Sequence, residues 1–239
     1  MRIDKMLANL GFGSRKEVKK LLKDGAVKVN DQPVKDAKLH VNPKDDTVTL
    51  NGEVIEYKEF IYLMMNKPPG VISATEDSYD QTVVDLLEFE DSVYSPFPVG
   101  RLDKDTEGLL LITNDGQLSH RLLSPKKHVP KTYFAVIDQE VSEGDISAFK
   151  KGVTLDDGYV TKPADLKIIK SGIRSDIELT ITEGKFHQVK RMFEAVGKKV
   201  IYLKRLTMGP LSLDESLELG EYRELTDEEI QQLIEYEAN

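Results

Sequence analysis

The apolar runs of this chain are short, and this feature most narrowly limits how it can fold. Two of the longest cover only residues 61–65 and 109–112. A helix needs ~20 apolar residues to cross a bilayer, so no membrane partner is expected. Short apolar runs bounded by polar segments are typical of buried strands. We therefore expect a core assembled from many short elements.

From Phe60 onward the sequence alternates between strand and helix patterns. Strands are predicted over residues 61–65, 108–113, 132–137, 176–182 and 200–205, and helices over 117–123, 142–151, 187–196 and 226–234. Strands outnumber helices and their connections vary in length. This pattern predicts an α+β fold, in which helices flank a mainly antiparallel mixed sheet.

The first 59 residues have a different pattern. A capping box at 14–17 opens a basic helix that Gly25 ends. Short strands are expected over 26–30, 47–50 and 53–55, with a turn at 31–33 and a hairpin turn at Asn51-Gly52. The polar stretch 56–59 is the expected linker. We therefore predict two domains, residues 1–59 and residues 60–239.

The formal net charge of −9 argues at first sight against a nucleic-acid partner. Its distribution changes that interpretation, because residues 211–239 hold ten acids and one base, whereas residues 1–210 hold 32 of each. Three acid-poor basic islands lie at 15–23, 119–133 and 183–205. Any one island is well explained as a solvated face, but three together favour nucleic-acid binding. The acidic tail is expected to lie away from the RNA face.

Several chemistries are excluded by residue type. The chain has no cysteine, so disulfides, zinc-thiolate sites and cysteine nucleophiles are ruled out. Asp103 and Asp105 imitate the start of a calcium loop, but the required twelfth-position acid is Asn114. The four histidines show no metal spacing, so no metal is expected. No signal-peptide run follows the N-terminus, and a cytoplasmic location is expected.

One segment is far more specific than these patterns. Residues 100–110 read GRLDKDTEGLL and resemble the GRLDxxTxGLL signature of bacterial ribosomal-RNA pseudouridine synthases. Residues 66–70 (NKPPG), 131–133 (KTY) and 183–192 (EGKFHQVKRM) resemble further motifs of that family in the same order. The first segment resembles the S4 RNA-binding domain that precedes the catalytic domain in the RsuA-type branch. The resemblance covers essentially the whole chain.

The resemblance implies isomerisation of a uridine to pseudouridine in ribosomal RNA, without a cofactor. Such an enzyme breaks the N-glycosidic bond, turns the base and rejoins it through carbon. The stretch 119–133 and the chain's end shortly after the helix at 226–234 favour a small-subunit (16S) target, either as ribosomal RNA or as a small-subunit assembly intermediate. A 23S target is the alternative within the family. A monomer is expected.

Two readings come from other classes of protein. One is a non-catalytic RNA- or ribosome-binding protein, against which the presence of all the motif residues argues. The other is a DNA-binding regulator, for which no helix-turn-helix is recognisable.

The resemblance also assigns site residues. Asp103 is expected to be the catalytic carboxylate and Lys190 its cationic partner, because an ionised carboxylate in a partly dry cleft is costly without a cation. Tyr133 is expected to stack on the extruded base and to assist proton removal from carbon. Arg101, Leu102 and Val189 are expected to support the site. Expected RNA contacts are Arg2, Lys5, Arg15, Lys16, Lys19, Lys20, Arg121, Lys126, Lys127, Lys131, His187, Gln188 and Arg191. His187 is equally well explained as a polar helix cap.

Overall fold

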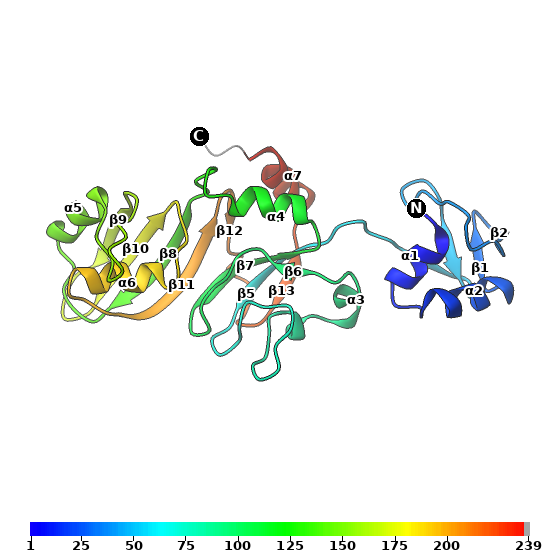
Figure 1. Cartoon of the computed structure of the whole chain (residues 1–239), viewed down its shortest axis with the longest axis horizontal. Helices are drawn as coiled ribbons and strands as arrows, with labels where there is room; N and C mark the ends of the chain where they lie inside the picture. The colour runs from blue at the N-terminus through cyan, green and yellow to red at the C-terminus, as the bar shows by residue number, and fades with distance from the viewer. Residues whose placement is uncertain (237–239) are drawn as a thin grey trace. The chain divides into compact units, whose positions relative to one another are not determined.

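A computed structural model of the 239-residue chain describes residues 1–236 (Figure 1). These residues form two compact units. The first unit comprises Met1–Ile61 together with Leu87–Pro96, and the second comprises Tyr62–Leu86 and the chain from Phe97 onward. None of the helices in the described residues is long and apolar enough to cross a membrane.

The first unit combines a four-stranded sheet, in the order β2-β1-β3-β4, with short helices. Its elements are α1 (Ile3–Asn9), α2 (Arg15–Lys23), β1 (Val27–Val29), β2 (Gln32–Pro33), β3 (Val48–Leu50), β4 (Glu53–Ile55) and α3 (Phe89–Ser92). The capping box predicted for α2 is confirmed, since the Glu17 carboxylate accepts from the Ser14 backbone N–H at 2.7 Å and the Ser14 hydroxyl accepts from the Glu17 N–H. All five bases of α2 are exposed, whereas Val18 and Leu22 are buried.

Two local predictions for this unit need correction. The chain turns at Asn30 and Asp31, not at 31–33, because both residues adopt a positive φ, 49° and 64°. Asn and Asp tolerate that conformation better than other non-glycine residues. Gln32–Pro33 then forms an edge strand, where proline does no harm to the ladder. The helix α1 was missed because only seven residues carry its pattern, and its stability comes from the burial of Ile3, Met6 and Leu7.

The second unit is built on a nine-stranded sheet whose main path runs β13-β5-β7-β11-β8-β10-β9, with β6 paired to β7 and β12 to β11. The strands are β5 (Tyr62–Lys67), β6 (Phe97–Pro98), β7 (Glu107–Thr113), β8 (Lys131–Ile137), β9 (Asp165–Lys170), β10 (Ser175–Ile181), β11 (Val200–Met208), β12 (Leu211–Ser212) and β13 (Tyr222–Glu224). Within the described chain, β7 with β11 is the parallel pair and the other pairings are antiparallel. The predicted α+β class with a mainly antiparallel mixed sheet is therefore confirmed.

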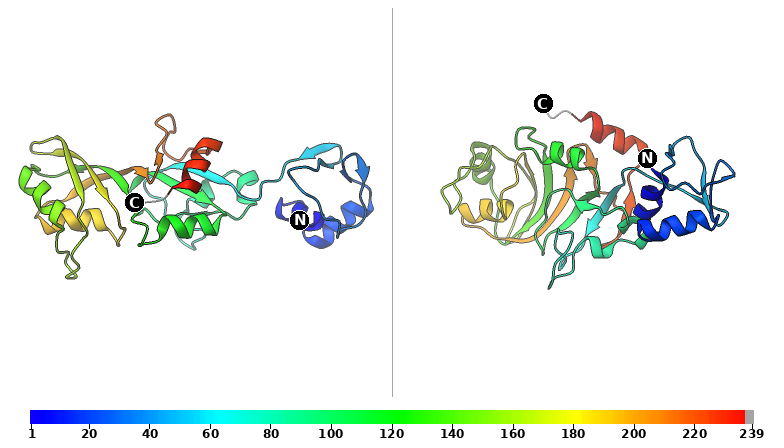
Figure 2. Two further views of the ribbon diagram at one scale, coloured as in Figure 1. Left: turned by 90° about the horizontal axis from the view of Figure 1, so that it is seen from above. Right: turned by 45° about the vertical axis from the view of Figure 1, so that its right-hand side comes forward.

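Helices cover the two ends of this sheet. They are α4 (Gly116–Leu123), α5 (Glu143–Lys151), α6 (Gln188–Ala195) and α7 (Asp227–Glu235), with a 3-10 turn at Val84–Leu86. α5 and α6 lie beside β8, β9 and β10, where the rings of Phe149 and Phe193 meet at 4.9 Å between centroids (Figure 1). α4 and α7 lie close to one another (Figure 2), and they share an apolar cluster with β5 and β7.

The packing of α7 sets the acidic tail beside one basic helix. α7 lies against α4, and Arg121 of the second basic island donates to the carbonyl of Ile234 at 3.2 Å. α7 therefore adjoins Arg121 of the second basic island, and the expectation that the acidic tail lies away from the RNA face stays a prediction.

The parallel strands β7 and β11 in the middle of the sheet approach one another closely at Gly108. A Cβ atom at this position would lie 2.3 Å from the backbone oxygen and 2.7 Å from the backbone nitrogen of Arg205. Its φ is +102°, a conformation that L side chains rarely adopt. Only glycine permits this close approach, which sets the loop before β7 beside β11 and β8.

Candidate active site

The loop before β7 carries Asp103 and is hydrogen-bonded to the segment that follows β5. The hydroxyl of Ser73 donates to the carbonyl of Leu102 and accepts from its N–H, both at 3.0 Å. The N–H of Gly70 donates to the carbonyl of Lys104 at 2.7 Å. These bonds fix the backbone on both sides of Asp103.

Lys67 supports the same loop from the protein interior; this residue and its hydrogen bonds are called the Lys67 clamp below. Its side chain is fully buried, and its ammonium donates to the carbonyls of Pro68 and Thr106, both at 2.9 Å. Burial lowers the pKa of Lys67 to about 8, although the carboxylates of Asp105 and Asp103 act in the opposite direction. The NKPPG segment therefore supports the loop mechanically and lies beneath it.

Asp103 meets the start of α6. The ammonium of Lys190 lies 3.1 Å from one oxygen of Asp103 and 2.6 Å from the carboxylate of Asp105. Burial alone would lower the pKa of Lys190, but its hydrogen bonds to Asp105 and Asp103 raise it above the usual value. Nε2 of His187 lies 3.6 Å from the other oxygen of Asp103. Asp103 thus faces a permanent cation, and a histidine lies close by.

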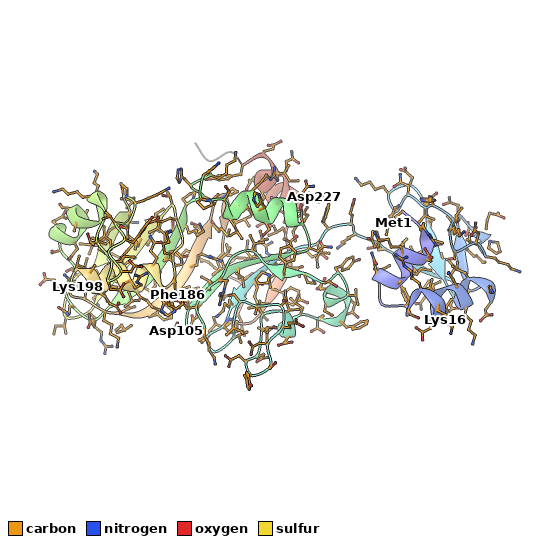
Figure 3. All side chains as sticks on the ribbon, viewed as in Figure 1. Met1, Lys16, Asp105, Phe186, Lys198 and Asp227 are labelled. Carbon is orange, nitrogen blue, oxygen red and sulfur yellow. The ribbon has the colours of Figure 1, made fainter. Side chains whose placement is uncertain are left out.

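His187 is held in an unusual backbone conformation. Its φ is +50°, in the left-handed region, and it is the N-cap of α6 without a side-chain capping bond. Its ring stacks on Phe186, with centroids 3.7 Å apart and planes inclined by 19°. Phe186 is 75% exposed, and Figure 3 shows it near the labelled Asp105.

The residues predicted for catalysis line a cavity of about 310 Å³. Asp103, Tyr133 and Lys190 line it together, although they come from a loop, a strand and a helix. Tyr133 is 8% exposed and is the first buried residue along β8. The supporting candidates Arg101, Leu102 and Val189 line the same cavity, as do Lys131, His187 and Gln188.

Two candidate RNA contacts have other partners in the structure. Gln188 is 4% exposed; its amide nitrogen donates to Glu183 at 2.7 Å and its oxygen accepts from the N–H of Lys185. We therefore reassign Gln188 from RNA contact to support of the 183–188 loop. Arg191 is paired with Asp156 and Asp157.

Apart from Lys131, His187 and Gln188, the candidate RNA contacts do not line this cavity. Arg2 pairs with Asp4 at 2.7 Å, and Arg121 bonds to α7. Those with exposed side chains are Lys5, Arg15, Lys16, Lys19, Lys20, Arg121, Lys126 and Lys127. The third island is spread along the fold, and Figure 3 shows Lys198 far from Phe186.

Several cavity residues were not singled out from the sequence. Arg205 and Leu203 of β11 reach the cavity, and so does Lys162. Arg205 belongs to the third basic island, and its place inside the predicted strand 200–205 was the available signal for burial. Among residues 1–236, no three potential metal-ligating His, Asp or Glu residues come together as a metal site.

Comparison with known proteins agrees with this site. The family model for RNA pseudouridylate synthase matches residues 61–195, and that for the S4 domain matches residues 1–46. An uncharacterized RNA pseudouridine synthase of Bacillus subtilis is 61% identical over 240 residues, covering 100% of both chains. The ribosomal small subunit pseudouridine synthase A of Vibrio cholerae is 43% identical, covering 96% of this chain and 98% of its own.

A solved structure of a pseudouridylate synthase has the same fold as this chain. The crystal structure of a pseudouridylate synthase, 39% identical, superposes with a TM-score of 0.68 and covers 98% of this chain and 99% of its own. The resemblance found in the sequence motifs is thus confirmed over both domains. The chain belongs to the RNA pseudouridine synthase family, as an enzyme that isomerises uridine to pseudouridine and carries an N-terminal S4 domain.

Proposed function

We propose that this enzyme modifies a specific uridine of small-subunit ribosomal RNA, with Asp103 as its catalytic carboxylate. The observation that carries the site assignment is the contact of Asp103 with Lys190 beside Tyr133 in one cavity. The target RNA rests on the full-length similarity to small-subunit enzymes such as that of Vibrio cholerae. A large-subunit target is the alternative, and a non-catalytic RNA-binding protein is the more distant one.

Each residue has a defined part in this proposal. Asp103 acts as an anion at the ribose or the base, since only the ionised carboxylate is nucleophilic or basic. Lys190 stays charged and holds that carboxylate in place. Tyr133 stacks on the extruded base, and its hydroxyl assists removal of the proton from carbon. Arg101, Leu102 and Val189 shape the surroundings of the base.

The basic residues outside the cavity supply the grip on the RNA. Residues 1–59 form the RNA-binding domain in this proposal, and residues 60–239 form the catalytic domain. The exposed bases of α2 contact phosphates at a distance from the target, which raises the effective concentration of the second site. The protein acts as a monomer in the cytoplasm, on free ribosomal RNA or on a small-subunit assembly intermediate.

The test compares two neighbouring carboxylates. Asp103→Asn and Asp105→Asn each remove one partner of Lys190, but Asp103 lines the cavity whereas Asp105 is 73% exposed and does not. Purified variants are incubated with small-subunit and large-subunit RNA transcripts, and pseudouridines are mapped. Asp103→Asn is expected to bind RNA normally and to form no pseudouridine, whereas Asp105→Asn stays active.

Each other outcome has a defined meaning. An active Asp103→Asn variant would contradict the assignment of the catalytic residue. Modification of the large-subunit transcript alone would transfer the target to that RNA. If the wild-type protein forms no pseudouridine on either transcript or on a subunit assembly intermediate, the non-catalytic alternative holds.

A further inference from the structure

Arg205 on β11 is a buried cation that has no acidic partner in the described part of the chain. Its side chain is 2% exposed, and its Nε donates to the carbonyl of Leu109 at 2.7 Å. The Nη2 atom is buried and has no hydrogen-bond partner among residues 1–236. Arginine remains charged in proteins, and burying such a charge is costly unless an acceptor meets it. The guanidinium is therefore suited to an acceptor that arrives with the substrate.

The position of Arg205 directs it into the cavity that holds Asp103. Arg205 lies directly opposite Tyr133 in the pairing of β11 with β8, and Lys131 lies two residues before Tyr133 on the same face. All three side chains line the cavity. Burial, together with the charge of Arg205, lowers the pKa of Lys131 to about 8. The sheet thus presents two cations beside Tyr133, the residue assigned to stack on the base; Arg205 and Lys131 are called the cavity floor below.

The depth of each cation in the cavity indicates which part of the RNA it contacts. Cations with exposed side chains, Arg101 and Lys185, stand at the cavity's outer side and suit phosphates. Arg205 lies deep beside Tyr133, where the flat base is expected. A uracil ring offers two carbonyl oxygens, which are the acceptors that a buried guanidinium needs.

We propose that Arg205, assisted by Lys131, binds a carbonyl oxygen of the extruded uracil and stabilises the negative charge on the base as the glycosidic bond breaks. This inference rests on the proposed function, in that it takes the Asp103 cavity as the catalytic site. It adds a cation for the leaving base, a role that neither Asp103 nor Lys190 has in the proposed function. Fixed donors aimed at developing charge in a dry site are an efficient form of catalysis.

The bond changes balance without a co-reactant. The N1–C1′ bond breaks and both electrons stay on the base, whose negative charge spreads over N1, O2 and O4. The sugar carries the complementary positive charge, which the Asp103 carboxylate faces. After the base has turned, C5 supplies the electron pair of the new C5–C1′ bond. The proton that C5 loses is matched by one gained at N1.

The first test measures rate and affinity separately. Arg205→Gln is compared with Lys204→Gln, the preceding residue on the same strand, which does not line the cavity. With a small-subunit RNA transcript, Arg205→Gln should lower the single-turnover rate by ~100-fold or more, with an affinity within about threefold of wild type. Lys204→Gln should leave both within about threefold. A tenfold or larger loss of affinity with an unchanged rate would indicate a phosphate contact and overturn the proposal.

The second test separates contact with the base from support of the fold. Transcripts containing 4-thiouridine or 2-thiouridine replace one carbonyl oxygen with sulfur, a poorer acceptor. If Arg205 contacts that oxygen, the wild-type rate falls with one of these transcripts, and the Arg205→Gln rate falls by less. If each transcript lowers the rate of Arg205→Gln by the same factor as the rate of the wild type, the proposal is overturned. Such equal factors mean that the sulfur substitution and the loss of Arg205 act independently.

Two results decide the remaining cases. If Arg205→Gln does not fold, Arg205→Lys takes its place, since it keeps the charge but loses the planar fork. A rate reduced about tenfold supports the proposal, and an unchanged rate overturns it. Asp103→Asn is measured in parallel. An active Asp103→Asn means that the site assignment itself fails, whereas an inactive Asp103→Asn beside a fully active Arg205→Gln refutes only the role of Arg205.

Discussion

Replacing Lys67 with methionine tests how the Asp103 loop is held. Methionine has nearly the same length and fits the buried site, but it cannot donate hydrogen bonds. The variant removes the bonds to the carbonyls of Pro68 and Thr106, both 2.9 Å long. The backbone that follows Asp103 then loses its hydrogen bond to a buried ammonium at Thr106.

The expected change in stability is small because two large terms oppose one another. Two hydrogen bonds from a charged donor contribute roughly 1.5–3 kcal/mol each. Burial of the ammonium opposes them, since a fall in the pKa of Lys67 from 10.5 to about 8 corresponds to ~3 kcal/mol. The free energy of unfolding should therefore fall by only about 0–3 kcal/mol at pH 7.

The expected change in activity is much larger. A displacement of Asp103 by about 1 Å is enough to lower the rate ~100-fold. Lys67→Met should therefore remain folded in urea titrations and lose ~100-fold in single-turnover rate. Lys104→Met, in the same loop but with a side chain 52% exposed, is the matched control and should keep its rate. A folded Lys67→Met variant with the wild-type rate would refute the clamp.

The pKa of Lys67 provides an independent check. The folded-state pKa of about 8 lies below the ordinary value of 10.5, so the folded state releases this proton first as the pH rises. The unfolded state then binds more protons between these two values, and stability rises with pH in that window. The gain from pH 8 to pH 9.5 should reach about 2 kcal/mol in the wild type relative to Lys67→Met. Equal pH dependence in the two proteins would contradict the lowered pKa.

Three further predictions concern other parts of the fold. Gly108→Ala should lower the free energy of unfolding, measured in urea titrations, by roughly 2–5 kcal/mol, because its Cβ would meet the backbone of Arg205. Gly116 has open space around it, so the control Gly116→Ala should change the free energy of unfolding by less than about 1 kcal/mol. Lys198→Met should cost about 1–3 kcal/mol at pH 7 and less at pH 3. Burial alone would raise the pKa of Asp145, but the hydrogen bond that it accepts from Lys198 at 2.8 Å lowers it. The stability that this pair contributes is therefore lost as the pH falls and Asp145 takes up a proton. An equal cost of Lys198→Met at both pH values would contradict the pairing. The triple change of Lys16, Lys19 and Lys20 to Gln should weaken RNA binding and reduce the slope of log affinity against log salt by about 2, whereas Lys150→Gln with Lys151→Gln should not.

Local rules in the sequence determined much of this protein. The capping boxes of α2 and α7 require residues only three positions apart, so Ser14 and Thr226 marked their helices correctly. The hairpin at Asn51-Gly52 is equally local. The motif around Asp103 identified the family, because a long match in one stretch of chain needs no knowledge of the fold.

Short elements escaped prediction because their own residues do not stabilise them. α1, β9 and β13 form where distant segments bury or pair with them, as β13 does with β5. Burial also changed the meaning of single residues. Gln188 and Arg205 stand among bases in the sequence, yet both side chains are at most 4% exposed.

Only the tertiary structure decided which groups face the substrate. Asp103 and Lys190 are far apart along the chain, and their 3.1 Å contact depends on the close approach of β7 to β11 at Gly108. The clamp by Lys67 and the floor formed by Arg205 likewise join segments that are distant in sequence. Periodicity reports which face of an element is apolar, whereas the partner of a buried charge is set by contacts between elements, and these exist only once the sheet has assembled.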